Sequence, residues 1–271
     1  LFLTFLYYSK VDKLKENNPM PIKKNISFCA QKLSDLFYEF SIYLKKQSSS
    51  LYPYTSINNL DKQISNLLPQ LLNSKTFYIE VGANDGITQS NTFFLEKKFK
   101  AKGMLIEASP SLYEKCFIYR SKQNIIENYA LVSPSYKKEF VKLIFGNLFT
   151  TQSKLNTDRF EHAKKGVIRK LPIRKFLGLP KDQVYNFFAP AITLNNLIEK
   201  HSINNVDLLS LDVEGDELSI LEGCSLEKGH IKNILVETSN YENVNIYLKN
   251  FGYSLIKKLS VHDYLFTKRN Q

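Results

Sequence analysis

The sequence predicts an α/β protein built on a mostly parallel sheet. From residue 76 onward, short apolar runs alternate with amphipathic helical patterns, which is the arrangement of parallel βαβ units. The last two apolar runs, 253–259 and 262–268, are too close together for a crossover, so we expect an antiparallel hairpin at the C-terminal end. A chain of 271 residues that is 43% hydrophobic and 23% charged can bury one such domain and carry an appendage.

The N-terminal part has a different pattern. Apolar residues at helical spacing predict one helix over 26–46 and a second over about 57–73, joined by a Ser- and Pro-containing linker at 48–56. We expect both helices to pack on a face or an edge of the sheet. The predicted division is therefore an N-terminal helical appendage and linker, 1–75, followed by the main domain, 76–271.

The elements of the main domain follow in order. Predicted strands cover 77–81, 103–108, 124–131, 138–145, 207–213, 231–238, 253–259 and 262–268. Predicted helices lie between them at 89–99, 109–122, 193–201, 214–223 and 242–252. Ser109 and Pro110 are typical of a helix start, and Gly252 is typical of a helix end.

The first residues of the sequence and its cysteines bear on the cellular location of the protein. LFLTFLYY, residues 1–8, is apolar but far shorter than the roughly 20 residues of a membrane span. This leaves open a removed or truncated N-terminal anchor, and we expect no membrane span elsewhere. Three scattered cysteines without a CxxC pair argue against a disulfide framework or a zinc site and favour a reducing, cytoplasmic location.

Charge is unevenly distributed. The net charge is +11, and the irregular insert 146–190 holds nine basic and three acidic residues, whereas residues 191–271 hold eight basic and eleven acidic residues. This pattern predicts an acidic site beside a basic rim. Because a long insertion is often functional, we expect the insert to contact an anionic acceptor, with Arg169, Lys170, Arg174 and Lys175 as its centre. The alternative is a solvated basic loop.

Ligands of parallel sheets bind at the carboxyl ends of the strands. The first such end is EVGANDG, residues 80–86, in which only Gly82 and Gly86 are glycine. It lacks the third glycine of a dinucleotide fingerprint and the Lys-Ser/Thr of a phosphate loop. Glu80 and Asp85 would repel a phosphate at close range but suit a cation. The loop therefore favours S-adenosyl-L-methionine (SAM), a cationic nucleoside without phosphate.

The remaining strand ends supply further candidates. Glu107 lies 21 residues after Gly86, where an acid accepts the ribose hydroxyls, and Ala108 follows it. Asn128 and Ala130 are placed to contact the adenine. Three acids, Asp212, Glu214 and Glu237, end or follow later strands. A buried carboxylate is costly unless it is paired, so Glu80 and Asp212, which lie in apolar strands, are functional candidates if they are unpaired. Glu214 equally suits a helix start.

Five segments together resemble the FkbM-like SAM-dependent methyltransferase family over roughly residues 76–268. They are EVGANDG, IEASPSLYEK, NYALVS, TLNNLIE and LLSLDVEGDELSILEG. The resemblance implies a class I methyltransferase (Rossmann-like) three-layer sandwich with a seven-stranded sheet, SAM as cofactor, and O-methylation of a hydroxyl, often on a sugar. Carried onto this sequence, it implies a cofactor loop of Glu80, Gly82, Asn84 and Gly86, a ribose acid at Glu107, and Asp212 on the floor of the site.

Methyl transfer to an oxygen requires alignment of the acceptor and a group that takes its proton. We expect one of Asp212, Glu214 and Glu237 to be this base, with Asp212 first and His262 a distant alternative. Two acids are too few to predict a metal. The expected acceptor is a small molecule or a glycan, with nucleic acid disfavoured. The rival functions are a catalytically inactive binding protein of the same fold and an NAD-dependent oxidoreductase.

Overall fold

The computed structural model describes residues 33, 36, 37, 39–48, 51–145, 151, 152 and 185–269. The chain divides into two compact units, Leu1–Leu51 and Tyr52–Gln271. In the first unit, residues 39–48 are helical, within and just beyond the predicted helix over 26–46, and the apolar side chains of Phe37 and Phe40 are exposed. Among the described residues, no helix is long and apolar enough to cross a membrane.

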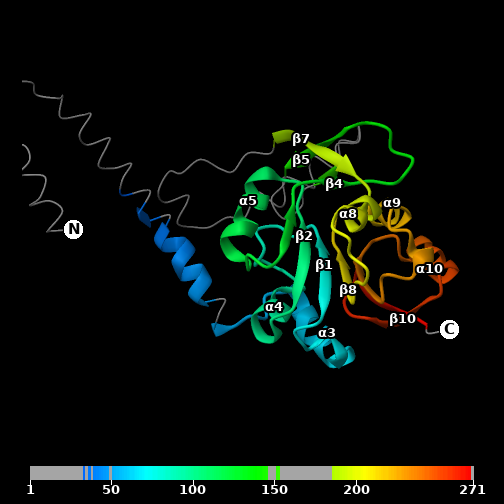
Figure 1. The fold of residues 1–271 in the computed structure, drawn as a ribbon, viewed down its shortest axis with the longest axis horizontal. Helices are drawn as coiled ribbons and strands as arrows, with labels where there is room; N and C mark the ends of the chain where they lie inside the picture. Colours follow the sequence, from blue (N-terminus) through cyan, green and yellow to red (C-terminus); the bar gives the residue numbers. More distant parts are fainter. Residues whose placement is uncertain are drawn as a thin grey trace, which may run out of the picture. The chain divides into compact units, whose positions relative to one another are not determined.

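The second unit is organised by a seven-stranded sheet, in the order β10-β11-β9-β8-β1-β2-β3 (Figure 1). The strands are β1 (Phe77–Val81), β2 (Lys102–Ile106), β3 (Ile125–Glu127), β8 (Leu208–Leu211), β9 (Asn233–Glu237), β10 (Tyr253–Lys258) and β11 (Asp263–Lys268). All neighbours pair in parallel except β11, which is antiparallel to both β9 and β10. The predicted fold class, including its C-terminal hairpin, is confirmed.

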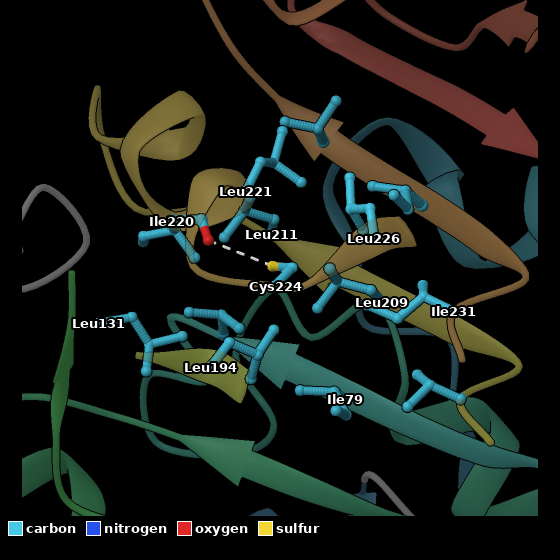
Figure 2. Packing of buried hydrophobic residues seen from close by; sticks show 14 of the residues in the cluster. Ile79, Leu131, Leu194, Leu209, Leu211, Ile220, Leu221, Cys224, Leu226 and Ile231 are labelled. Carbon is cyan, nitrogen blue, oxygen red and sulfur yellow. Dashed lines mark hydrogen bonds between the residues drawn. The ribbon is translucent and has the colours of Figure 1, made fainter. Parts of the chain in front are cut away.

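Both faces of the sheet are buried, because successive side chains along each central strand pack into clusters on opposite sides. Ile79 and Val81 join a cluster with residues of α8 (Leu194–Lys200), α9 (Glu217–Glu222) and α10 (Tyr241–Asn250), part of which Figure 2 shows. Tyr78 points the other way, into a cluster with residues of α3 (Leu60–Leu67), α4 (Phe93–Phe99) and α5 (Pro110–Tyr119). Because successive side chains of a strand point to opposite faces, β1 is covered on both sides. The result is a three-layer sandwich.

The helix expected over 57–73 is divided into three short pieces. A 3-10 turn, Ile57–Asn59, leads into α3, and a second 3-10 turn covers Pro69–Leu71. Pro69 has no backbone N–H and therefore interrupts the helical hydrogen bonding. Leu60, Ile64 and Leu71 nevertheless pack in the same cluster as Tyr78. The domain boundary at residue 75 stays a prediction.

A second, four-stranded sheet lies at the carboxyl ends of the main strands. Its order is β4 (Ala130–Leu131), β7 (Tyr185–Ile192), β5 (Phe140–Phe145) and β6 (Thr151–Gln152). The predicted strand 124–131 is thus divided between β3 and β4, in different sheets, and the predicted strand 138–145 becomes β5 of the small sheet. The basic side chains of the insert lie outside the described residues.

Candidate active site

A cavity opens at the carboxyl ends of β1, β2 and β8, with β4 and β5 forming one side. Its lining includes five acidic residues, Glu80, Glu107, Asp212, Glu214 and Asp216. Of the described residues that line it, none is basic. A pyrophosphate in such a cavity would find no basic partner among these residues, whereas a cation would find carboxylate oxygens. A cavity with an acidic lining therefore lies at the strand ends that the sequence analysis singled out.

The loop after β1 is pressed against the end of β8. Gly82 has a φ of +78°, and a Cβ atom there would lie 1.9 Å from the carbonyl oxygen of Asp212. No side chain fits at this position, so the glycine is required by the close approach of the two backbones. Asn84 follows, also with a positive φ of 51°. The loop thereby brings its backbone to the floor of the cavity.

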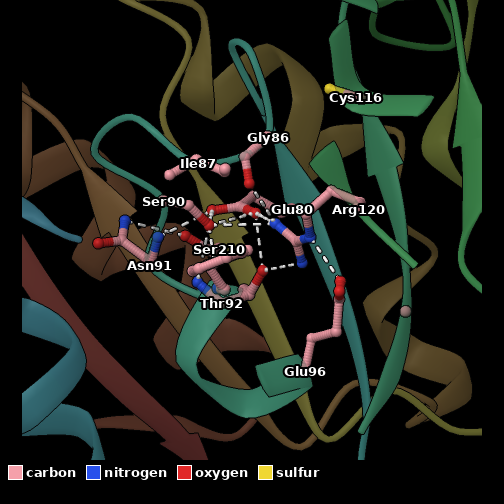
Figure 3. Close-up of polar contacts among 12 residues, drawn as sticks. Glu80, Gly86, Ile87, Ser90, Asn91, Thr92, Glu96, Cys116, Arg120 and Ser210 are labelled. Atoms are coloured by element: carbon pink, nitrogen blue, oxygen red, sulfur yellow. Dashed lines mark hydrogen bonds and ion pairs between the residues drawn. The ribbon is translucent and has the colours of Figure 1, made fainter. Parts of the chain in front are cut away.

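The Glu80 carboxylate is fully engaged by protein groups (Figure 3). It accepts hydrogen bonds from the hydroxyls of Ser90 (2.9 Å) and Thr92 (2.7 Å) and from the backbone N–H of Asn91 (2.8 Å). It also pairs with the guanidinium of Arg120 at 3.1 Å. Glu80 lines the cavity, but its charge is balanced within the protein. Its role as a cofactor ligand stays a prediction.

Arg120 connects this network to the rest of the loop. Its side chain is fully buried, and its Nε donates to Glu96 at 2.7 Å. Its Nη1 also donates to the carbonyl of Gly86 at 3.0 Å. One guanidinium therefore holds Glu80, Glu96 and the loop after β1 together, which compensates for the burial of both carboxylates.

Glu107 is oriented by two backbone donors. One carboxylate oxygen accepts from the N–H of Asn84 and the other from the N–H of Ser109, both at 2.8 Å. Burial raises the pKa of Glu107 to about 7, and the nearby charge of Asp85 adds to this effect. The carboxylate lines the cavity with its position fixed and with further lone pairs left to accept hydroxyls.

The third strand end differs from the expectation. Asn128 does not line the cavity, because its amide donates to the carbonyls of Glu107 (2.8 Å) and Ala108 (3.0 Å). Tyr129, which was not predicted, lines it instead, beside Ala130. The sequence did carry a signal for Tyr129: it is an aromatic residue between Asn128 and Ala130, the two residues predicted to contact the adenine.

The acids after β8 and β9 form a coupled cluster. Burial, together with the charges of Glu237 and Glu214, raises the pKa of Asp212 well above its ordinary value. Burial and the charge of Asp263 likewise raise the pKa of Glu237 to about 7, although its side chain is hydrogen-bonded to Asp212. Asp212 and Glu214 line the cavity, whereas Glu237 does not. Glu214 has a φ of 57°, which is uncommon for a residue with a side chain.

The structure therefore gathers most, but not all, of the predicted site residues. Those that line the cavity are Glu80, Gly82, Asn84, Glu107, Ala108, Ala130, Asp212 and Glu214. Those that do not are Asp85, Gly86, Asn128 and Glu237. Asp85 shapes the turn by accepting from the N–H groups of Ile87 (3.0 Å) and Thr88 (2.7 Å). His262 is exposed, and the described residues contain no cluster of three or more His, Cys, Asp or Glu that would hold a metal.

Residues 80–255 match the family described as the methyltransferase FkbM domain. The chain belongs to this family. The FkbM family membership agrees with the fold and implies SAM as the cofactor. No curated protein matches the chain.

Three solved structures of other proteins are similar to the chain at low sequence identity. The TrmK protein of M. capricolum in complex with S-adenosyl-homocysteine is 15% identical, with a TM-score of 0.30 over 74% of this chain, which spans 65% of that protein. A putative RNA methyltransferase from Pyrococcus horikoshii is 9% identical, with a TM-score of 0.37 over 78% of this chain and 82% of that one. M. jannaschii TYW2 in complex with AdoMet is 12% identical, with a TM-score of 0.29 over 76% of each chain.

The cavity fits SAM on its own chemistry. Its acidic lining complements a sulfonium and an amino group, and the fixed Glu107 carboxylate suits a vicinal diol. Apolar and aromatic groups, including Tyr129 and Leu131, supply a surface for a flat base.

Proposed function

We propose that this FkbM-family protein is a SAM-dependent O-methyltransferase that acts on a hydroxyl of a sugar or glycan-type acceptor. The observation that carries the proposal is the cavity lined by carboxylates and, among the described residues, by no basic side chain. Asp212, whose pKa is raised by burial and neighbouring acids, lies on its floor. A carboxylate whose pKa is raised is a stronger base than an ordinary one, which suits it to proton transfer.

Five residues would hold the cofactor. Glu107 would accept the two ribose hydroxyls, and Tyr129 and Ala130 would contact the adenine. The backbone of Gly82 and Asn84 would approach the methionine part, which the close packing of this loop on β8 permits. Glu80 and Asp85 would act indirectly, by fixing the loop through the hydrogen bonds described above.

Bound SAM supplies a methyl group on a sulfonium, which is already a good leaving group. The chain must then align the acceptor oxygen and remove its proton. Asp212 in its ionised form would receive this proton as the new carbon–oxygen bond forms. Glu237, hydrogen-bonded to Asp212, would tune its basicity, and Glu214 would help to position the hydroxyl. Two interacting carboxyl groups titrate as a pair, so the pH–rate profile belongs to both.

Three further expectations accompany this proposal. An anionic small-molecule or glycan acceptor is supported by the basic composition of the insert, and nucleic acid stays disfavoured. A cytoplasmic location is supported by the scattered cysteines, of which Cys116 and Cys224 are buried and free. The catalytically inactive binding protein and the NAD-dependent oxidoreductase remain the competing functions.

Isothermal titration with SAM and with NAD separates these functions. We expect SAM to bind and NAD not to bind, because the described residues that line the cavity offer a pyrophosphate no basic partner. Transfer of a labelled methyl group from SAM to oligosaccharide hydroxyls, lost in Asp212→Asn, would support the enzyme. Binding of NAD without SAM would overturn the proposal, and SAM binding with no transfer to any hydroxyl acceptor would favour the inactive binding protein.

A further inference from the structure

The small sheet presents one continuous face toward the cofactor cavity. In the antiparallel pairing of β5 with β7, Val141 lies opposite Ala189, and Leu143 lies opposite Phe187. Residues two apart on a strand share a face, so these pairs lie on the same side of the sheet. Leu143 is one of the residues that line the cavity. This face is therefore an extension of the cavity wall.

Burial decreases along this face. Val141 and Ala189 are 2% and 1% exposed, and they pack in a cluster with Leu143, which is 5% exposed. Phe187 is half-buried at the edge of this cluster. Tyr185, one step further, is 46% exposed. The wall thus continues from the cavity onto the surface.

The exposed end of the face is aromatic. Phe145 lies opposite Tyr185, and their rings stack with centroids 4.8 Å apart and planes at 20°. The Tyr185 and Phe187 centroids are 6.2 Å apart. We call these three residues the aromatic shelf. Two residues of a strand span about 7 Å, so the stacked pair begins about that far beyond Leu143, roughly one ring from the cavity wall.

We propose that the aromatic shelf binds a neutral sugar ring of the acceptor and so directs its hydroxyl toward Asp212. This rests on the proposed function. The argument for this occupant is continuity: the shelf prolongs the wall of the site in which the acceptor must react. Aromatic faces without charge pack against the C–H face of a pyranose, and exposed apolar patches mark binding surfaces. The acceptor's anionic group would be recognised elsewhere.

The opposite face of β7 provides a matched control. Phe188 is also aromatic and is 63% exposed, but its register partner is Lys142, so it points away from the shelf. Phe188→Ala removes an aromatic ring from the same strand but from the other face. Tyr185→Phe keeps the ring and removes only the hydroxyl, while Tyr185→Ala removes the shelf's exposed ring.

The experiment has two readouts on the full chain. The first is binding of the protein, saturated with S-adenosyl-homocysteine, to an array of neutral oligosaccharides and, in parallel, to single-stranded RNA oligomers. The second is the KM for the saccharide bound best, with the Kd for SAM measured alongside. We expect Tyr185→Ala to weaken saccharide binding and raise this KM about fivefold, with the Kd for SAM unchanged. Tyr185→Phe and Phe188→Ala should resemble the parent.

Each contrary result has a distinct meaning. Equal losses of saccharide binding in Tyr185→Ala and Phe188→Ala, or no loss in either, would overturn the proposal that the aromatic shelf binds the acceptor. Tyr185-dependent binding of RNA without binding of any saccharide would overturn the sugar assignment. Tyr185-dependent saccharide binding without methyl transfer would leave the shelf standing as a sugar site and remove the proposed catalytic function instead.

Discussion

Replacing Glu237 by Gln should stabilise the protein at alkaline pH and leave its stability at acidic pH nearly unchanged. Glu237 sits at the end of β9, hydrogen-bonded to Asp212 and opposite Asp263 of β11 in the sheet register. Glu214 and Glu217 add further negative charge nearby. Ionising this carboxyl in the folded chain therefore places one more negative charge among acids. The amide of Gln removes that charge while keeping a donor for Asp212.

The magnitude follows from the two protonation states. In the unfolded chain Glu237 loses its proton near its ordinary pKa of 4.5, whereas the folded chain retains it to about 7. Between these values the folded state binds more protons, so the free energy of unfolding falls as the pH rises. The full difference corresponds to about 3 kcal/mol, which solvent screening at this half-buried site reduces to about 1–2 kcal/mol.

The assay is urea unfolding of the parent and of Glu237→Gln at about pH 4 and about pH 8, on either side of the window. The variant should gain stability over the parent only at the higher pH. Glu242→Gln, at the exposed start of α10, controls for the loss of one negative charge. Equal stability of parent and variant at both pH values would refute the raised pKa of Glu237 in the folded chain. A gain in stability of the same size at both pH values would show that the raised pKa of Glu237 is not the cause of the gain.

Three other substitutions test the site. Glu107→Gln should raise the Kd for SAM more than about tenfold in titration calorimetry, because it turns an NH₂ toward a backbone donor and removes charge-assisted bonds to the ribose; unchanged affinity would place the ribose elsewhere. Asp212→Asn should abolish most methyl transfer while circular dichroism shows an intact fold; parental turnover would make Asp212 structural. Arg120→Met should cost about 3–5 kcal/mol in urea unfolding, since it strands two buried carboxylates, whereas Lys97→Met, which removes a partly exposed partner of Glu96, should cost about 1 kcal/mol or less. Similar losses in these two variants would argue against a buried network.

The sequence was most informative where local pattern and burial agree. Residues 77–81 form β1 as predicted, because apolar residues fill both faces of a central strand. The partner of Glu80 was not predictable in the same way. Arg120 directly follows α5, at a position where a basic residue ordinarily points into solvent. Only the folded chain brings it 40 residues back to Glu80, so the expectation of an unpaired acid had no local signal to correct it.

The break in the predicted strand 124–131 shows a second limit. Its isoleucines and Tyr129 favour extended backbone, and a local pattern does not distinguish one strand from two in different sheets. The separation depends on Asn128, whose amide satisfies the carbonyls of Glu107 and Ala108 at the end of β2. That bond fixes the direction in which Tyr129 and Ala130 continue, and it also explains why Asn128 is turned away from the cavity.

The central strand of the small sheet, β5, pairs with β6 on one side and with β7 on the other, so both Gln152, the last residue of β6, and Tyr185, the first residue of β7, are held by β5. The two ends of the chain between β6 and β7 are therefore fixed on either side of one strand. Closing a longer loop between fixed ends is inexpensive, since each doubling of length costs only about 0.6 kcal/mol. We therefore expect this segment to tolerate replacement by chains of other lengths and charges, in evolution or by design, without loss of the fold of the seven-stranded sheet.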